Sequence, residues 1–312
     1  LADRADAKVN HGLALMQSGD AAAAFAVQRA ALRQDARCQP AWNNLLLTAH
    51  YMPELTAQQV TALHRDHARL FPAAPVPEFP NTRDPARRLR IGLVSGDLRD
   101  HPVGYFLEAA LMAHDRHGFA FFAYSNHATE DATSARLRTA CEAWHRVATL
   151  DDAALEARIR GDAIDILVDL AGHTQGTRQA VFERRPAPVQ AGWIGYASTS
   201  GCAAMDWIIA DAVGIPPDEE ALYTERVLRL PGSYLCFTPP AFDVPRTPPP
   251  MLTRGHVTFG CFNNPAKLNP RVLRAWARIL AGLPDARLLL KARPFGEPAT
   301  AAAMRARFAA AG

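Results

Sequence analysis

The fold is decided by the stretch Arg88-Leu-Arg-Ile-Gly-Leu-Val-Ser95 and by the residues that follow it, Gly96-Asp-Leu-Arg-Asp-His101-Pro102. The first part is a short apolar run, which predicts a buried strand, and the second part is small and polar, which predicts a loop. Pro102 biases the backbone of His101 away from the helical conformation, so we expect a helix to begin just after it, over 104–114.

Strands and helices alternate downstream of this stretch. Further strands are expected at 119–125, 164–170, 189–194, 206–210 and 226–230, and further helices at 130–141, 151–160 and 176–184. Such alternation predicts a mostly parallel sheet that is covered by helices, as in a Rossmann-like domain. The fold class expected for this part of the chain is therefore α/β.

A second α/β unit is expected after a Pro-rich stretch at 239–250. A strand at 257–262, a helix at 270–281 and a strand at 287–292 have the β–α–β order that opens a Rossmann-like domain. Domains of this kind usually need at least about 100 residues. We therefore expect the remainder of this domain to lie beyond Gly312 or on another chain.

The first 71 residues predict helices without strands. If Gly19 is placed at the turn of a helix–turn–helix repeat of about 34 residues, Gly12 and Ala24 fall on its small positions. Trp42 then occupies the position where this tetratricopeptide (TPR) repeat often has Trp, although Lys8 occupies it in the first unit. A generic Ala-rich helical hairpin is the alternative interpretation.

Composition and charge narrow the classes of function. Of the 312 residues, 49% are hydrophobic and 21% are charged, with a formal net charge of +3 and no long run of Lys or Arg. This composition is globular and does not favour nucleic acid as a partner. Five widely spaced cysteines without a CxxC pair argue against a zinc site and favour reduced thiols. Without a recognisable signal peptide or an apolar run of about 18 residues, we expect a cytoplasmic protein with no membrane partner.

Polar residues gather where the predicted strands end, which is where open α/β sheets bind ligands. The loop after 88–95 contains Asp97, Asp100 and His101. A histidine at this place could act as a general base or donate a hydrogen bond to a phosphate. In the alternative interpretation, Asp97 and His101 only cap and brace the turn.

Three other segments also place polar or small residues at strand ends. His173 follows the strand 164–170, and the small-residue loop from Trp193 to Gly201 would let a sugar approach the backbone. Lys267 follows the strand 257–262 and suits a diphosphate, whose negative charge grows as it leaves. A structural histidine and an exposed loop lysine are the alternatives.

The chemistry-bearing segments form an ordered set of motifs. The motifs are Trp42-Asn-Asn-Leu-Leu-Leu, Tyr51-Met-Pro-Glu-Leu, Leu89-Arg-Ile-Gly-Leu-Val-Ser-Gly-Asp97, Asp100-His101-Pro102, Asp169-Leu-Ala-Gly-His173-Thr, Arg185-Pro-Ala-Pro-Val-Gln190, Gly195-Tyr-Ala-Ser-Thr-Ser-Gly201-Cys-Ala-Ala-Met-Asp206, Phe262-Asn-Asn-Pro-Ala-Lys267 and Gly296-Glu-Pro298. In this order they resemble the O-linked N-acetylglucosamine (O-GlcNAc) transferase family over nearly the whole chain. The match resembles a bacterial member, because no long insertion separates the two catalytic lobes.

The resemblance implies a TPR-like α-helical N-terminus followed by an α/β GT-B glycosyltransferase with two Rossmann-like lobes. Such an enzyme transfers GlcNAc from a UDP-sugar donor, UDP-GlcNAc, to Ser or Thr hydroxyls of a protein or peptide acceptor, with inversion and with no metal or other cofactor. The implied parts are a TPR-like region at 1–71, a linker at 72–88, an N-terminal catalytic lobe at 89–238, a Pro-rich linker at 239–253 and the start of a nucleotide-sugar-binding lobe at 254–312.

The resemblance also assigns roles to single residues. His101 matches the active-site histidine and Asp97 the nearby acid, and each is a candidate general base. Lys267 matches the lysine that holds the diphosphate and is expected to be catalytic with them. The residues expected to bind substrate are Pro102, Ile194, Gly195, Asn264, His67 and His173.

The chain departs from the family pattern at three places. Its helical array is short, so selection of protein substrates by a long superhelix is not expected. Ala266 stands where the family often has an aromatic residue. The uridine-binding segment is expected beyond Gly312, so we expect weak UDP binding by this chain alone. Two alternative functions stay open, a GDP-fucose-dependent protein O-fucosyltransferase of the same architecture and a TPR scaffold with an inactive catalytic domain.

Overall fold

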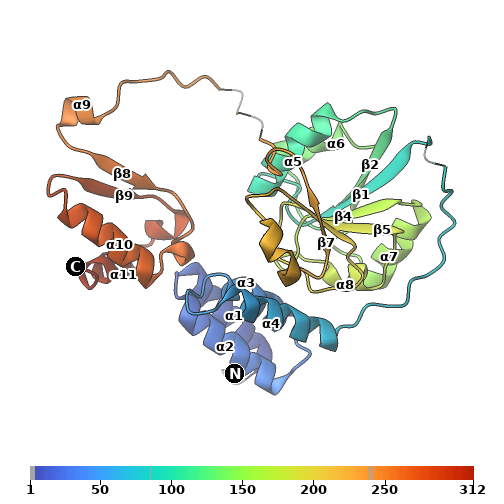
Figure 1. The fold of residues 1–312 in the computed structure, drawn as a ribbon, viewed down its shortest axis with the longest axis horizontal. Coiled ribbons are helices and arrows are strands. Elements are labelled where there is room, and N and C mark those ends of the chain that lie inside the picture. The colour runs from blue at the N-terminus through green and yellow to red at the C-terminus, as the bar shows by residue number, and fades with distance from the viewer. Residues whose placement is uncertain (1–3, 85, 238, 240–241) are drawn as a thin grey trace. The chain divides into compact units, whose positions relative to one another are not determined.

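The structure is a computed structural model that describes residues 4–84, 86–237, 239 and 242–312 (Figure 1). The chain divides into two compact units. The helix–strand unit combines Leu1–Thr56 with Ala241–Gly312, and the sheet unit spans Ala57–Pro240. Three residues at the predicted Pro-rich linker and its boundary, at positions 238, 240 and 241, lie outside the described residues.

In the described part of the sheet unit, seven strands form one sheet. They are β1 (Leu89–Ser95), β2 (Phe119–Ser125), β3 (Ala143–Arg146), β4 (Ile166–Asp169), β5 (Val189–Gly192), β6 (Trp207–Ala210) and β7 (Arg226–Arg229). Their order in the sheet is β3-β2-β1-β4-β5-β6-β7, and all neighbours are parallel. The predicted parallel sheet is confirmed, whereas the sequence does not predict β3, which is short and only half-buried.

Helices cover both faces of this sheet (Figure 1). They are α5 (Pro102–Ala113) and α6 (Ala132–Arg138) on one face, and α7 (Asp152–Gly161) and α8 (Gln179–Glu183) on the other. These four helices are confirmed where the sequence predicts them, although their ends differ by one to several residues. Differences of this size at helix ends are common because the terminal turns fray.

The strands supply two hydrophobic cores, one on each face of the sheet. Leu93 and Val168 pack in the core beneath α5 and α6. Their neighbours Val94 and Leu167 pack in the other core, with α7 and α8. Because successive side chains of a strand point to opposite faces, a continuous apolar strand can fill both cores.

The helix α4 (Ala57–Leu70) belongs to the sheet unit. It contacts the 3-10 helix η1 (Pro217–Leu222), where Arg65 donates a 3.0 Å hydrogen bond to the carbonyl of Ala221. The sequence predicts helices throughout the first 71 residues, but the structure begins this helix at residue 57. The shorter helix leaves residues 51–56 free to form turns.

The segment 72–88 connects α4 to β1 and is anchored on Asp165. The side chains of Asn81 and Arg87 each donate a 2.6 Å hydrogen bond to the Asp165 carboxylate, which is buried. Buried carboxylates are stable only when such partners replace water. The predicted linker is therefore held against the amino ends of the strands.

The helix–strand unit contains the remaining elements. They are α1 (Ala5–Gln17), α2 (Ala21–Gln34), α3 (Gln39–Ala49), α9 (Met251–Arg254), β8 (Thr258–Cys261), η2 (Pro265–Lys267), α10 (Pro270–Ala281), β9 (Arg287–Leu290), η3 (Arg293–Gly296) and α11 (Pro298–Ala309). The strands β8 and β9 are parallel, so the predicted β–α–β order is confirmed. The short α9 begins at Met251, inside the predicted linker 239–253. None of the helices described in either unit is both long and apolar enough to cross a membrane.

The helices α1 and α2 approach closely at the small positions that the sequence predicts. A Cβ atom on Gly12 would lie 2.1 Å from Nε2 of Gln28, which donates a 3.1 Å hydrogen bond to the carbonyl of Val9. Ala24 and Ala31 are fully buried on α2. Larger residues at these positions would force the two helices apart.

Replacing Leu107 by Ala should destabilise the sheet unit. Leu107 is 1% exposed in the core beneath α5, so the cavity left by truncation should lower the free energy of unfolding by about 2–5 kcal/mol. Met112, on the same helix, is 45% exposed, and Met112→Ala should change this free energy by less than about 0.5 kcal/mol. Chemical denaturation measures both variants, and equal losses would contradict this core.

Candidate functional site

The strands β1 and β4 are neighbours in the sheet although two strands separate them in the chain. The chain continues from β1 toward β2 and from β4 toward β5, so the strand order reverses between β1 and β4. In open α/β sheets, ligands bind beyond the carboxyl ends of the strands at such a switch point. The loops that follow β1 and β4 meet here, since a Cβ atom on Gly96 would lie 3.4 Å from the Cα atom of Gly176.

The loop after β1 brings three side chains together. The amide of Asp97 donates a 2.9 Å hydrogen bond to Oγ of Ser95, which turns the loop back on the strand end. The Asp97 carboxylate then lies 3.4 Å from Nη2 of Arg99 and 3.7 Å from Nδ1 of His101. The sequence identifies Asp97 and His101 but misses Arg99, whose only signal is its place between them.

His101 caps the amino end of α5. Its backbone is extended, and its Nδ1 accepts a 3.3 Å hydrogen bond from the amide of Val103, while Pro102 begins the helix. In the neutral imidazole the proton is therefore on Nε2. Burial lowers the pKa of His101 from its usual value; the Asp97 carboxylate opposes this shift and Arg99 adds to it. The loop thus presents a neutral imidazole whose Nε2 can donate a hydrogen bond.

The buried carboxylate of Asp169 shapes the loop after β4. It accepts hydrogen bonds from the amides of Ala171 (2.9 Å) and Gly172 (3.0 Å), and Gln179 also donates to it. Burial raises the pKa of Asp169 to about 6, although these hydrogen bonds oppose the rise. Gly172 has a positive φ of 54°, a conformation that favours glycine. This loop therefore has one well-defined path.

Ile194 and Gly195, the predicted sugar-contacting residues, form a strained turn after β5. Ile194 has a φ of 50°, in the left-handed region that β-branched residues rarely adopt. A Cβ atom on Gly195 would lie 1.7 Å from the carbonyl oxygen of Leu170, so only glycine fits. Strain of this kind persists where neighbouring groups hold it, and it is common at ligand sites.

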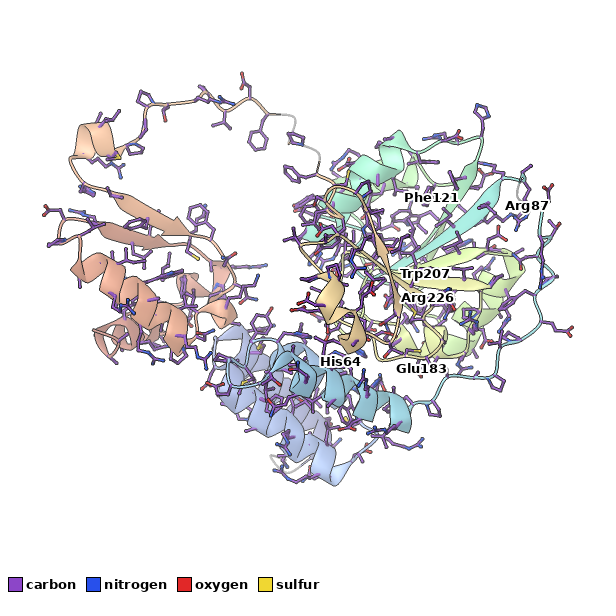
Figure 2. All side chains as sticks on the ribbon, in the orientation of Figure 1. His64, Arg87, Phe121, Glu183, Trp207 and Arg226 are labelled. Carbon is purple, nitrogen blue, oxygen red and sulfur yellow. The ribbon has the colours of Figure 1, made fainter. Side chains whose placement is uncertain are left out.

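His67 and His173, both predicted to bind substrate, are buried in one cluster. This histidine cluster consists of His64, His67, His173 and Tyr196, and its three imidazoles are 0–3% exposed. The ring centroid of His173 lies 5.0 Å from that of His67 and 5.4 Å from that of His64. Figure 2 labels His64, which comes from α4. Although three histidines meet here, no group of His, Cys, Asp or Glu among the described residues is arranged to hold a metal ion.

Lys267 and Asn264 lie in the helix–strand unit, in the turn after β8, whereas the other predicted site residues belong to the sheet unit. Oδ1 of Asn264 accepts a 3.0 Å hydrogen bond from the amide of Ala266. Ala266 is buried against Met16 and Ala24, whereas Lys267 is exposed. A buried small residue thus anchors a turn that presents the lysine, which explains why an aromatic residue does not precede it.

Comparison with known proteins identifies relatives over most of the chain. The model of glycosyl transferase family 41 matches residues 41–237. A probable UDP-N-acetylglucosamine–peptide N-acetylglucosaminyltransferase SPINDLY from Solanum lycopersicum is 39% identical over 271 residues, which cover 85% of this chain and 29% of that protein. A UDP-N-acetylglucosamine–peptide N-acetylglucosaminyltransferase from Caenorhabditis elegans is 36% identical over 151 residues, which cover 47% of this chain and 13% of that protein.

A solved structure has the same fold. A mutant O-GlcNAc transferase from Thermobaculum terrenum matches with a TM-score of 0.93 and 39% identity, over 99% of this chain and 59% of that chain. The chain therefore spans a little over half of that protein and less than a third of the two curated relatives.

Stability should depend on pH through His67. Burial, with a smaller contribution from His64, lowers the pKa of His67 from 6.5 to about 4. Between about pH 6.5 and pH 4 the unfolded chain binds a proton at His67 and the folded chain does not. Stability therefore falls as the pH falls through this range. In His67→Gln the loss between pH 7 and pH 5 should be about 2 kcal/mol smaller than in the unmodified protein.

Chemical denaturation at the two pH values measures this difference. The carboxyl groups of Asp169 and Glu183, whose pKa values are raised by burial, titrate in both proteins and so cancel in the comparison. The same pH dependence in both proteins would show that the His67 side chain is not buried as described.

Proposed function

The chain belongs to glycosyl transferase family 41, and from this membership we propose that the complete enzyme transfers GlcNAc from UDP-GlcNAc to Ser or Thr hydroxyls of proteins, with inversion. The family resemblance inferred from the sequence is confirmed. The names of the curated relatives describe UDP-GlcNAc:peptide transfer. The observation that carries the proposal for this chain is the switch point between β1 and β4, where His101 caps α5.

We propose a GT-B architecture in which the sheet unit is the N-terminal lobe and β8–α10–β9 opens the second lobe. The strand order β3-β2-β1-β4-β5-β6 is that of a doubly wound nucleotide-binding sheet, which supports the first part. A TPR origin of α1–α3 is supported by the close helix contact at Gly12 and the buried Ala24. The domain boundaries predicted at residues 88, 238 and 253 belong to the same proposal. The predicted boundary at residue 71 is replaced by the division at Thr56, which keeps α4 with the sheet.

His101 is proposed to act as a hydrogen bond donor to the substrate. The amide of Val103 already uses the Nδ1 lone pair, so the neutral ring offers a proton on Nε2 and no free lone pair toward a hydroxyl. Asp97 lies beside this ring and offers carboxylate oxygens, which supports it as the group that accepts a proton. The same orientation of the His101 ring thus serves both roles: Nδ1 caps α5, and Nε2 can donate a hydrogen bond to the substrate.

Lys267 is proposed to stabilise the departing UDP. Negative charge grows on the diphosphate during transfer, and a positioned cation lowers the energy of that state most when it need not move. The turn that presents Lys267 is fixed by Asn264 and by the buried Ala266. In this proposal protein groups stabilise the leaving group, so that the reaction requires neither a metal ion nor another cofactor.

The remaining predicted site residues are proposed to shape the substrate-binding surface. The Ile194–Gly195 turn would meet the sugar with its backbone, and Pro102 fixes the start of α5, a helix whose core residues pack with Ile194. His67 and His173 would support this surface from beneath, since both are buried. The proposed partners are a UDP-sugar donor and a protein or peptide acceptor. A cytoplasmic location is part of the same proposal and is supported by five cysteines that form no disulfide in the described structure.

Replacing Lys267 by Ala in the complete enzyme should lower kcat by at least about 10²-fold, because a positioned charge at the leaving group is lost. Arg274, an exposed cation on α10 of the same unit and not at a strand end, gives the control, and Arg274→Ala should keep near-normal turnover. Release of UDP in the presence of an acceptor peptide measures both. Normal turnover by Lys267→Ala would remove Lys267 from the proposed mechanism.

The nucleotide that stabilises the complete enzyme tests the donor. Ligands that bind only the folded state raise its stability, by about 2.7 kcal/mol at a concentration of 100 times Kd. UDP should therefore raise the melting temperature more than GDP at the same concentration. A larger effect of GDP would favour the O-fucosyltransferase alternative, and no hydrolysis of any nucleotide sugar would favour the inactive scaffold.

A further inference from the structure

Tyr196 connects the strained turn to two other segments of the sheet unit. It follows Gly195 directly in the chain. Its hydroxyl oxygen lies 2.8 Å from Nε2 of His64, on α4. Its Cβ atom lies so close to Gly172 that a Cβ atom on that glycine would be 2.3 Å away. One side chain therefore contacts the helix that precedes the sheet, the loop after β4 and the turn after β5.

His64 is oriented to accept a hydrogen bond from Tyr196. Its Nδ1 lies 2.8 Å from the carbonyl oxygen of Val60, which can only accept, so in the neutral ring Nδ1 carries the proton. The other nitrogen, Nε2, is then the acceptor, and the Tyr196 hydroxyl is the donor. His64 is fully buried, and a Cβ atom on Gly201 would lie 2.6 Å from its carbonyl oxygen. The position and the tautomer of this acceptor are therefore both set by its surroundings.

The turn beside Tyr196 needs such support. Ile194 keeps a left-handed conformation that an unrestrained β-branched residue would leave. The carbonyl of Leu170 limits Gly195 on one side. On the other side, Tyr196 ties the chain to α4 through its hydroxyl and to Gly172 through its Cβ atom. Losing the Tyr196 hydroxyl would leave the steric contact between Gly195 and Leu170 in place and would remove the hydrogen bond to His64.

We propose that Tyr196 is a positioning residue: held by His64, it keeps the Ile194–Gly195 turn in the conformation that binds the sugar of the donor. This inference rests on the proposed function, which assigns the turn to the sugar. In this proposal, α4 supports the donor site through His64, and no side chain of α4 needs to contact the donor. A protein whose binding-competent conformation is only partly populated binds its ligand more weakly in proportion to that fraction.

The variant Tyr196→Phe in the complete enzyme tests the proposal. The ring stays, so its packing on Gly172 is kept, and only the hydroxyl is lost. The KM for UDP-GlcNAc should rise about three- to tenfold, because a smaller fraction of the protein has the competent turn. The kcat should change less than about twofold, because the chemistry of the bound donor is unaltered.

Tyr124→Phe is the matched control. Tyr124 is fully buried on β2, and its hydroxyl donates a 2.8 Å hydrogen bond to the Asp162 carboxylate, away from the turn. Both variants lose one hydrogen-bonded hydroxyl, so both melting temperatures should fall. Only Tyr196→Phe should raise the KM, and an equal rise in both variants would overturn the positioning role.

A double variant tests whether Tyr196 acts through His64. In a His64→Leu background, Tyr196→Phe should raise the KM by less than about twofold further, because the acceptor is already absent. Independent, multiplicative effects of the two substitutions would overturn the coupling. The single variant Tyr196→Phe remains decisive if the His64 variants do not fold.

Hydrogen exchange separates failure of this proposal from failure of the proposed function. In Tyr196→Phe, the amides of 193–197 should exchange faster, whereas those of β1 should be unchanged. If the complete enzyme transfers no sugar from UDP-GlcNAc, the proposed function fails, and this exchange alone decides whether Tyr196 holds the turn. Unchanged exchange would overturn the proposal, as would faster exchange with an unchanged KM in an active enzyme.

Discussion

The buried carboxylate of Asp169 is the interaction on which the rest of the candidate site depends. It ends β4, and its hydrogen bonds from the amides of Ala171 and Gly172 set the path of the following loop. That path places the carbonyl of Leu170 where it excludes any side chain at Gly195. Burying a charged carboxylate is unfavourable unless hydrogen bonds replace its water. The hydrogen bonds from these amides therefore stabilise both the buried carboxylate and the loop that supplies them. The loops after β4 and β5 are consequently shaped together.

The two units contribute to the proposed function by different physical means. The sheet unit covers both faces of its sheet and offers shaped loops. The helix–strand unit offers charge, since residues 242–312 contain 11 Lys and Arg against three Asp and Glu. Such an excess attracts anions over distances longer than a hydrogen bond. It accords with a diphosphate as the ligand of the turn that presents Lys267, whose buried neighbour Ala266 fixes it in place.

The sequence predicts the elements that are long, apolar and periodic, and it predicts the strand-end polar residues Asp97 and His101. It does not predict β3, a strand of four residues that carry no apolar run, of which three are half-buried and one is exposed. Pairing of His64 with Tyr196 is also beyond sequence reasoning, because 132 residues separate them and only the folded chain brings them together. Strain at Ile194 is invisible in the sequence for the same reason, since a β-branched residue normally signals a strand.

The membership of α4 in the sheet unit sets where this protein can be divided. A fragment that starts at residue 72 would retain all the strands but would remove His64 and His67 from the histidine cluster, and Gly201 would lose the helix backbone against which it packs. The boundary at which segments of this protein could be exchanged therefore precedes α4, near Thr56. Replacement of the N-terminal helices must keep Met16 and Ala24, which pack against Ala266, whereas α4 must be inherited together with the sheet.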